Sequence, residues 1–532
     1  MANSNRKQSF LHGAALLAAA TVIVKIIGAI YKIPLRSIIG DAGFGYFNTA
    51  YDIYSVLLMI STAGLPVAMS RMIAEANSLG HYGQVRRTYK TAMYLFVLLG
   101  GLGTLLMTGF SKPLANFMNS PGSWAAIAAL GPASVLLCIT SAFRGFFQGQ
   151  GNMRPTSISQ VLEAVCKLVI GLGLALYIKR SLDDVPLAAG GAILGVTIGC
   201  LMALLYMLGA FRVASGEMPS GGGPVMSWRD TAKGLLAIAI PITIGSAGLQ
   251  IITLIDAKVV MGRLLDACRM SQAAADDLKG IYNFAQTIFN LPCAFVTPIT
   301  VSIIPAITER LTLRNMRGVR QTEEASVRVM GLLTMPCAVG LTVLSRPIMG
   351  MLGGYSGENL TVAGRLLTTL GPCVLFNSVV LLTNAIMQAH GYVYLPVVNM
   401  FAGGLVKILV NFLLVGSPSI NIQGAPIGTL CCYLCITVLN LFTMRRVLRH
   451  APAVGRSLLP PLAASVLMGG ATFVLWKLVS AVTSSNLIQC AVPILGAAAV
   501  YALLVIKLRV ITYEDCMLLP KGEQIARLLR IR

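Results

Sequence analysis

The sequence has 532 residues, of which 56% are hydrophobic and only 11% are charged, with a mean hydropathy of +0.77. Soluble globular domains carry about 25% charged residues, so this composition excludes an ordinary soluble protein and indicates an integral membrane protein. The net charge of +22 would suggest a nucleic-acid partner for a soluble chain. Membrane proteins instead collect Lys and Arg in their cytoplasmic loops, and we therefore expect no nucleic acid as a partner.

Fourteen apolar stretches are long enough to cross a bilayer, because a spanning helix needs about 20 mostly apolar residues. We therefore predict an all-α polytopic membrane protein of about fourteen helices. In chain order the predicted spans are 10–35, 46–74, 91–113, 124–149, 157–178, 187–211, 231–261, 281–308, 327–350, 363–390, 393–416, 424–448, 456–480 and 485–509.

The distribution of basic residues predicts the orientation. If the N-terminus is cytoplasmic, most of the 41 Lys and Arg fall in cytoplasmic segments, as the positive-inside rule requires. This favours the cytoplasmic membrane with both termini inside. A cleaved signal peptide is an alternative for the first stretch, since Arg6 and Lys7 precede it and Ala18 to Ala20 resemble a cleavage site. Apolar sequence continues directly at Val22, which favours a retained span.

The first two spans carry ionisable residues that are costly inside a membrane. Lys25, Lys32 and Arg36 are seven and four residues apart, a spacing that puts them on one stripe of a helix. Lys25 is the most central, whereas Lys32 and Arg36 lie nearer the outer end and can reach the headgroups by snorkelling. Asp52 follows in the second span. We predict that these four side chains line a substrate-binding cavity.

Further ionisable residues lie in the fifth and seventh spans. Glu163 and Lys167 are four residues apart with the acid first, the favoured order for a helical ion pair, so mutual neutralisation is an alternative to a cavity role for Lys167. Asp256 and Lys258 are two residues apart and point to different faces of a helix, so their partners must come from other helices. We include Lys167, Asp256 and Lys258 in the predicted cavity.

A parallel repeat organises the chain. Gly131-Pro132, Gln148, Gly151 and Lys167 recur as Gly371-Pro372, Gln388, Gly391 and Lys407, all at one offset, and Gly45 and Asn48 have a weaker echo in Gly280 and Asn283. We predict a first lobe of six helices (1–218), a glycine-rich cytoplasmic linker (219–230), a second lobe of six helices (231–450), and two further helices with a basic tail (451–532). Parallel repeats in transporters place the substrate site at the repeat interface, so Lys407 joins the predicted cavity residues.

The sequence has few marks of an enzyme. It lacks the Walker A, H-E-x-x-H and G-x-S-x-G motifs. The C-x-x-C spacing of Cys432 and Cys435 is typical of metal or redox sites, but it falls within a span, where small apolar core residues are the simpler interpretation. We expect no cofactor and no metal, with transport coupled to the membrane potential, a proton or a sodium ion.

The segment KIIGAIYKIPLRSIIGDAGFGYFNTAYDIYSVLLMISTAGLPVAMSRMIAE, from Lys25 to Glu75, resembles the opening of the stage V sporulation protein B family of polysaccharide-biosynthesis exporters, within the superfamily that includes multidrug exporters and lipid II flippases. The resemblance implies two six-helix bundles forming a V around a cavity, and alternating-access translocation of an undecaprenyl-pyrophosphate-linked saccharide such as lipid II. It also implies that Lys25, Lys32 and Arg36 contact the anionic head group. Partners would be this substrate, membrane lipids and cell-wall synthesis proteins.

Three other functions stay open from the residues alone. A cation-coupled drug exporter is disfavoured by the excess of lysines within the spans. A membrane glycosyltransferase would use outer-loop carboxylates such as Asp183 and Asp184. A scaffold for cell-wall assembly would tolerate neutral residues in place of the lysines.

Overall fold

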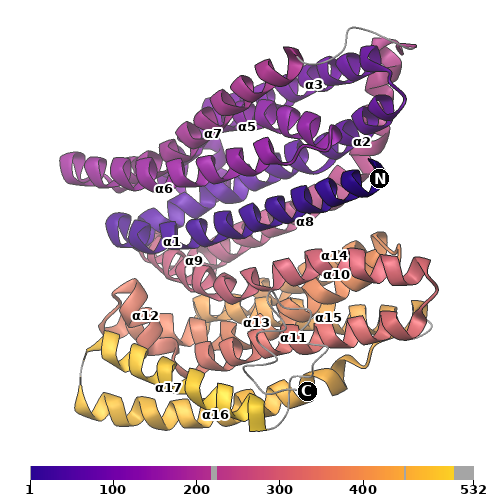
Figure 1. The fold of residues 1–532 in the computed structure, drawn as a ribbon. Helices are drawn as coiled ribbons and strands as arrows, with labels where there is room; N and C mark the ends of the chain where they lie inside the picture. Colours follow the sequence, from indigo (N-terminus) through magenta and orange to yellow (C-terminus); the bar gives the residue numbers. More distant parts are fainter. Residues whose placement is uncertain (1, 217–223, 449–450, 484, 508–532) are drawn as a thin grey trace. The chain divides into compact units, whose positions relative to one another are not determined.

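The computed structural model describes residues 2–216, 224–448, 451–483 and 485–507. Within these ranges the chain is helical and contains no β-strand, which confirms the all-α prediction (Figure 1). Residues 219–223 of the predicted linker and 508–532 of the predicted basic tail lie outside the described residues.

Twelve helical stretches of the described chain are long and apolar enough to cross a membrane, so the predicted number of fourteen is approximate. One of the twelve, Ala19–Ser78, has 60 residues and contains most of the first two predicted spans. It consists of part of α1 (Ala2–Met59), the π-helix η1 (Ile60–Gly64) and α2 (Leu65–Ser78). Within α1 the backbone turns sharply at Gly40, which has φ 74° and ψ −178°, a conformation that only glycine adopts readily.

The eighth predicted span, 281–308, is not among the twelve, because it is divided between two shorter helices. These are α9 (Gln272–Ala294) and α10 (Val296–Thr312), which meet at Phe295. Three prolines, Pro292, Pro298 and Pro305, lie in this region, and proline removes the backbone donors that a continuous helix needs. The division of this segment therefore follows from its composition.

The described chain forms two compact units, Met1–Asn283 and Phe284–Arg532. The division into lobes predicted from the sequence is not tested by these units and stays a prediction. Unit 1 contains, after α2, the helices α3 (Tyr82–Gly109), α4 (Ser111–Phe117), α5 (Trp124–Gly149), α6 (Arg154–Leu182), α7 (Val185–Gly216), α8 (Trp228–Asp266) and the first part of α9. Helices α5, α6 and α7 pack on one another and on α1, and α8 packs on α1, α2 and α3.

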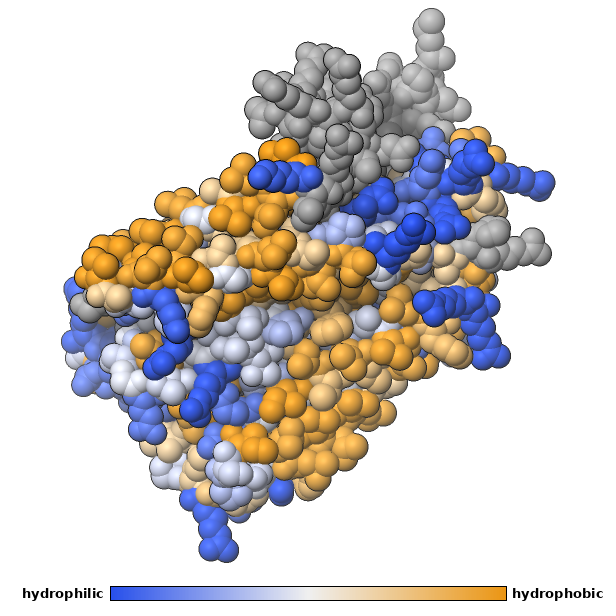
Figure 2. Space-filling model, turned by 90° about the horizontal axis from the view of Figure 1, so that it is seen from below, coloured by the Kyte–Doolittle hydropathy of each residue, from blue (hydrophilic) through white to orange (hydrophobic). Residues whose placement is uncertain are grey.

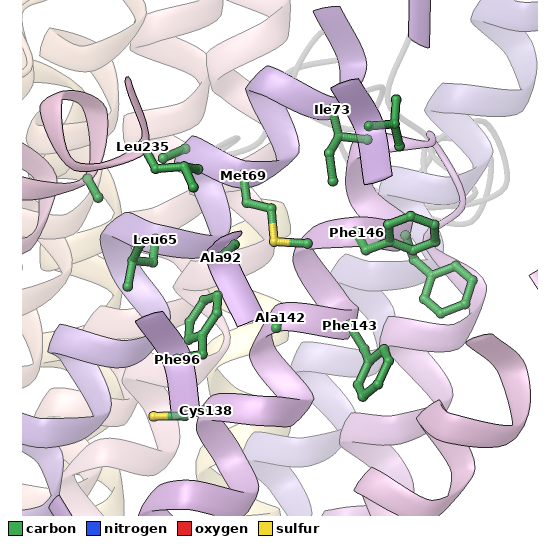
Figure 3. Packing of buried hydrophobic residues seen from close by; sticks show 14 of the residues in the cluster. Leu65, Met69, Ile73, Ala92, Phe96, Cys138, Ala142, Phe143, Phe146 and Leu235 are labelled. Atoms are coloured by element: carbon green, nitrogen blue, oxygen red, sulfur yellow. The ribbon is translucent and has the colours of Figure 1, made fainter. Parts of the chain in front are cut away.

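The core of unit 1 is apolar where α2, α3, α5 and α8 meet. Figure 3 shows Met69 and Ile73 of α2 beside Phe96 of α3 and Phe146 of α5, and all four side chains are fully buried. Aromatic rings from α3, α5 and α7 continue this packing, with Tyr89 and Phe211 stacked at a centroid distance of 4.7 Å. This core fixes α5 relative to α2 and so positions the polar residues on the other side of α5.

Unit 2 contains α10, α11 (Met316–Val343), α12 (Ser345–Gly353), α13 (Gly357–Ala389), α14 (Tyr394–Leu414), α15 (Gly424–Val447), α16 (Val454–Val482) and α17 (Asn486–Lys507). One apolar cluster of this unit joins α10, α11 and α13 through buried residues such as Ile307, Met330 and Ile386. Short 3-10 helices, η2 (Pro121–Ser123) and η3 (Asn421–Gln423), precede α5 and α15.

Large apolar side chains also cover the outside of the long helices. Examples are Leu105 of α3, Val169 of α6 and Leu405 of α14, each about two thirds exposed. Figure 2 shows broad hydrophobic areas on the face in view, with hydrophilic side chains near their margins. A bilayer stabilises such a surface because its hydrocarbon tails, and not water, surround the apolar side chains. The molecule is therefore a multi-pass membrane protein.

Candidate functional site

A cavity of about 510 Å³, with charged and polar side chains among its mostly apolar lining, lies within unit 1, between α1, α2, α5, α6 and α7. Its charged lining residues are Lys25 of α1, Arg144 of α5, and Glu163 and Lys167 of α6. Three cations and one carboxylate give the lining a positive excess. The remaining polar lining groups include three tyrosines, Tyr31, Tyr51 and Tyr54, and two glutamines, Gln148 and Gln160. The arrangement suits an anionic, hydrogen-bonding ligand.

Glu163 pairs with an arginine of the neighbouring helix. Arg144 donates from Nη2 to Glu163 Oε2 at 3.0 Å, and from Nε to Ser159 Oγ at 3.0 Å. The alternative expected from sequence, neutralisation by Lys167 one turn along α6, is replaced by this pair between helices. Arg144 was not among the predicted cavity residues, although a basic residue inside the apolar stretch 124–149 was a signal for it.

Lys167 lies among aromatic rings of α1. Its Nζ donates to Tyr51 Oη at 2.7 Å and lies 4.6 Å from the Tyr51 ring centroid and 5.1 Å from that of Tyr31. The negative faces of aromatic rings stabilise an ammonium group without neutralising it. These contacts therefore fix the position of the Lys167 ammonium group at the cavity wall. The sequence analysis did not single out Tyr51, because nothing in its local pattern distinguishes it from the other tyrosines of the segment.

The predicted basic stripe of α1 divides between different environments. Lys25 is exposed and lines the cavity. Lys32, seven residues further on, donates to Asn48 Oδ1 at 3.3 Å. Arg36 makes two parallel hydrogen bonds of 2.8 Å to Asp41, across the turn at Gly40. The last arrangement fits arginine because its planar fork matches a carboxylate, and it holds the two halves of α1 together.

A second polar group gathers where α1 meets α9. Lys279 is 3% exposed and donates from Nζ to Thr49 Oγ1 at 3.0 Å. The carboxylates that act on its charge are those of Asp52, Asp256 and Asp276. Asp52 and Asp256, both predicted cavity residues, therefore share an electrostatic environment. Lys279 was missed because it was assigned to a loop, although it directly precedes Gly280, which the repeat had matched to Gly45 at the start of an apolar span.

The last two predicted site residues lie elsewhere. Lys258 of α8 has its Nζ 3.4 Å from the ring centroid of Phe117 in α4. Lys407 belongs to α14 in unit 2, where it acts electrostatically on Tyr433 and Cys373. Of the eight predicted residues, Lys25 and Lys167 are those that line the cavity of unit 1.

The loop carboxylates considered for a glycosyltransferase have structural partners. Asp183 ends α6 with φ 49° and pairs with Lys179 at 2.5 Å. The Lys179 ammonium lowers the pKa of this carboxyl. Asp184 Oδ1 accepts a hydrogen bond from the backbone N–H of Leu187 at 2.9 Å, which satisfies a donor in the first turn of α7.

The chain is similar along most of its length to known families of membrane proteins. The family model described as polysaccharide biosynthesis protein matches residues 10–310, and the MatE model matches 259–413. The Bacillus subtilis uncharacterized membrane protein YabM is 27% identical and the alignment covers 98% of this chain and 96% of the relative. Stage V sporulation protein B of the same species is 25% identical, and the alignment covers 97% of this chain and 98% of that relative. The lipid II flippase MurJ of the same species is 25% identical over 82% of each chain.

Two solved structures share the fold. The inward closed conformation of lipid II flippase MurJ aligns with a TM-score of 0.69 at 13% identity, and the alignment covers 93% of this chain and 99% of the other. An inward-facing multidrug resistance MATE family transporter of the MOP superfamily aligns with a TM-score of 0.65 at 13% identity. The alignment covers 81% of this chain and 98% of the other. At this identity the likeness concerns the fold, and it agrees with the architecture expected from the family resemblance.

Proposed function

Because the chain belongs to the polysaccharide biosynthesis protein family, whose model matches residues 10–310, we propose that it is a flippase that moves a lipid-linked saccharide across the cytoplasmic membrane. The substrate class is an undecaprenyl-pyrophosphate-linked saccharide, with lipid II as the first candidate. Relatives named stage V sporulation protein B and lipid II flippase support this class. Both termini lie in the cytoplasm in this proposal.

The observation that carries the proposal is the positive cavity of unit 1. A pyrophosphate is an anion rich in acceptor oxygens, and Lys25, Arg144 and Lys167 present donors and positive charge in one cavity. Because Glu163 balances the charge of Arg144, the two lysines supply the net positive charge that meets the ligand. A lysine contacts phosphate as a point charge and imposes little geometry, which suits a ligand that must be released again.

In the proposed transport cycle the substrate first binds and the helices then rearrange. The pyrophosphate enters the cavity from the cytoplasmic side and binds Lys25 and Lys167, while the polyprenyl tail stays in the lipid. A rearrangement of the helices then opens the cavity to the other side. Outward movement of an anion is favoured by an inside-negative potential, by about 2.3 kcal/mol per charge per 100 mV.

The experiment is a flipping assay with the reconstituted protein and a fluorescent lipid-linked saccharide. Lys25→Ala and Lys167→Ala should each lower the rate at least tenfold, since loss of one charge-assisted contact costs about 1.5 to 3 kcal/mol. Lys477→Ala is the matched control, because Lys477 is an exposed lysine of α16 beside Phe473. Absence of flipping by the unsubstituted protein, or unchanged rates in both cavity variants, would contradict the proposal.

A second candidate is a cation-coupled exporter of drugs. The MatE match at 259–413 and the MATE structural likeness favour it, whereas the positive cavity opposes binding of a cationic drug. Efflux of a cationic dye from cells that express the protein separates the two, because a lipid flippase leaves the dye concentration unchanged.

A further inference from the structure

A buried carboxyl group in unit 2 has no ordinary partner. Glu323 of α11 is 1% exposed, and neither of its side-chain oxygens has a hydrogen-bond donor among the described residues. Its neighbours along α11, Val319 and Val327, belong to the apolar cluster shared with α10 and α13. An ionised carboxylate without donors is strongly disfavoured in such surroundings. The site therefore calls for a positive charge or a proton.

A histidine lies close to Glu323. His390 follows α13 directly, and its Nε2 lies 3.6 Å from Glu323 Oε1. The other ring nitrogen, Nδ1, lies 3.0 Å from the carbonyl oxygen of Ile386. A carbonyl only accepts hydrogen bonds, so Nδ1 must carry the hydrogen. In a neutral imidazole Nε2 then has only a lone pair to present to Glu323.

We infer that Glu323 and His390 form a binding site for one proton in the core of unit 2. With the proton on the carboxyl, Glu323 donates to Nε2. With the proton on the imidazole, Nε2–H donates to the carboxylate. Both arrangements carry zero net charge, and removal of the proton leaves a buried anion facing a lone pair. The His390 side chain is 16% exposed, which gives the proton a path to water that Glu323 itself lacks.

The surrounding charges do not replace the proton. The neighbours of Glu323 on α11, the exposed Arg320 and the half-buried Glu324, pair with each other at 2.9 Å, and Glu324 also accepts from Ala453 N at 3.4 Å. Arg310 of α10 donates to the Gly318 carbonyl and to Thr322. Further charged side chains on α11, on α13 and on the helices packed against them include Glu309, Arg317, Arg328, Arg346, Glu358, Arg365, Lys407, Arg445, Arg446 and Arg456.

The site makes stability depend on pH in a defined direction. In the unfolded chain Glu323 is ionised above about pH 4.3 and His390 is mostly neutral above about pH 6.5. The folded protein holds the shared proton, so unfolding above about pH 6.5 releases it. Stability therefore falls as pH rises, and the unfolding constant increases up to tenfold per pH unit for one proton. This inference does not depend on the proposed transport.

The test compares thermal unfolding in detergent between about pH 6 and 9. In Glu323→Gln the amide can donate to Nε2 without taking up a proton, and in His390→Gln the amide can donate to the carboxylate. Each variant should lose the slope of up to tenfold per pH unit. Glu324→Gln, which removes the neighbouring half-buried carboxylate that is paired with Arg320, should keep it. If the stability of either folded variant falls with pH as steeply as that of the unsubstituted protein, the inference is overturned.

Discussion

At the residue scale, the pair between Arg144 and Glu163 is neutral in sum, so the positive excess of the cavity comes from Lys25 and Lys167. The two side chains are 11% and 26% exposed, so removal of Arg144 leaves a carboxylate that water reaches only in part. We expect Arg144→Met to lower stability by about 1 to 3 kcal/mol, below the range for a fully buried pair because of this exposure. Thermal unfolding in detergent measures the change.

The double variant Arg144→Met with Glu163→Gln provides the control for this prediction. Removing both charges also removes the uncompensated carboxylate, so the double variant should recover most of the lost stability. If the loss of stability in the double variant equals the sum of the losses in Arg144→Met and Glu163→Gln, the pair contributes no coupling energy, contrary to the prediction.

Asp276 gives stability a second, acidic dependence on pH. Burial raises the pKa of this carboxyl to about 6, although Tyr46 and Gln272 donate to it at 3.0 and 3.1 Å. Since the folded protein then binds a proton that the unfolded chain has lost, stability should fall as pH rises from about 4 to about 6 and stay level above. The whole effect is about 2 to 3 kcal/mol.

Asp276→Asn tests this by unfolding measurements between about pH 4 and 7. Asparagine still accepts from Tyr46 and Gln272 but does not titrate. The free energy of unfolding of the variant, relative to that of the unsubstituted protein, should therefore be higher at pH 7 than at pH 4. If the difference between the variant and the unsubstituted protein is the same at both pH values, Asp276 titrates normally.

At the element scale, the contact of α1 with α9 depends on glycine. A Cβ built on Gly280 would overlap the backbone carbonyl oxygen of Asp41, and one on Gly45 would lie 3.3 Å from the carbonyl oxygen of Asp276. Backbone atoms cannot move aside as a side chain can. We therefore expect Gly280→Ala to separate the two helices and to destabilise the protein by several kcal/mol, on the scale of overpacked cores, measured as lost monodisperse protein and a lower melting temperature.

Gly101→Ala is the matched helical control for Gly280. A Cβ at Gly101 meets nothing within 4 Å, so alanine should raise the stability of α3 by up to about 1 kcal/mol. Equal effects of the two substitutions would argue against a close contact at Gly280.

The elements also show what sequence could and could not predict. Apolar length alone locates α3, α5, α6 and α7, because a bilayer requires such stretches. The turn that separates the first two predicted spans within α1 depends on one residue, Gly40, whose positive φ cannot be recognised among the many glycines of this chain. Lys167 was predicted to line the cavity, but its partner Tyr51 lies in α1, more than 100 residues earlier. Lys279 was missed because its burial depends on Thr49, 230 residues away.

At the scale of the whole molecule, the distribution of Lys and Arg predicts the topology. We expect the segment 219–230 to face the cytoplasm and the connection at Asp183 and Asp184 to face outward. A protease recognition sequence inserted after Gly221 should resist protease added to intact spheroplasts and be cut after lysis. The same insertion after Asp183 should be cut in both. The reverse pattern would invert the proposed direction of transport.

The energy source is likewise a property of the whole molecule in its membrane. If the cargo is anionic and moves without a coupled ion, an inside-negative potential of 100 mV should shift the distribution of a lipid-linked saccharide outward by about 50-fold per charge. Proteoliposomes with a potassium diffusion potential and a fluorescent substrate measure this distribution. Collapse of the potential should abolish the shift, whereas pH or sodium gradients applied at zero potential should leave it unchanged. Accumulation driven by either gradient at zero potential would mean that a proton or sodium ion moves with the substrate, because an uncoupled anion has no other source of free energy.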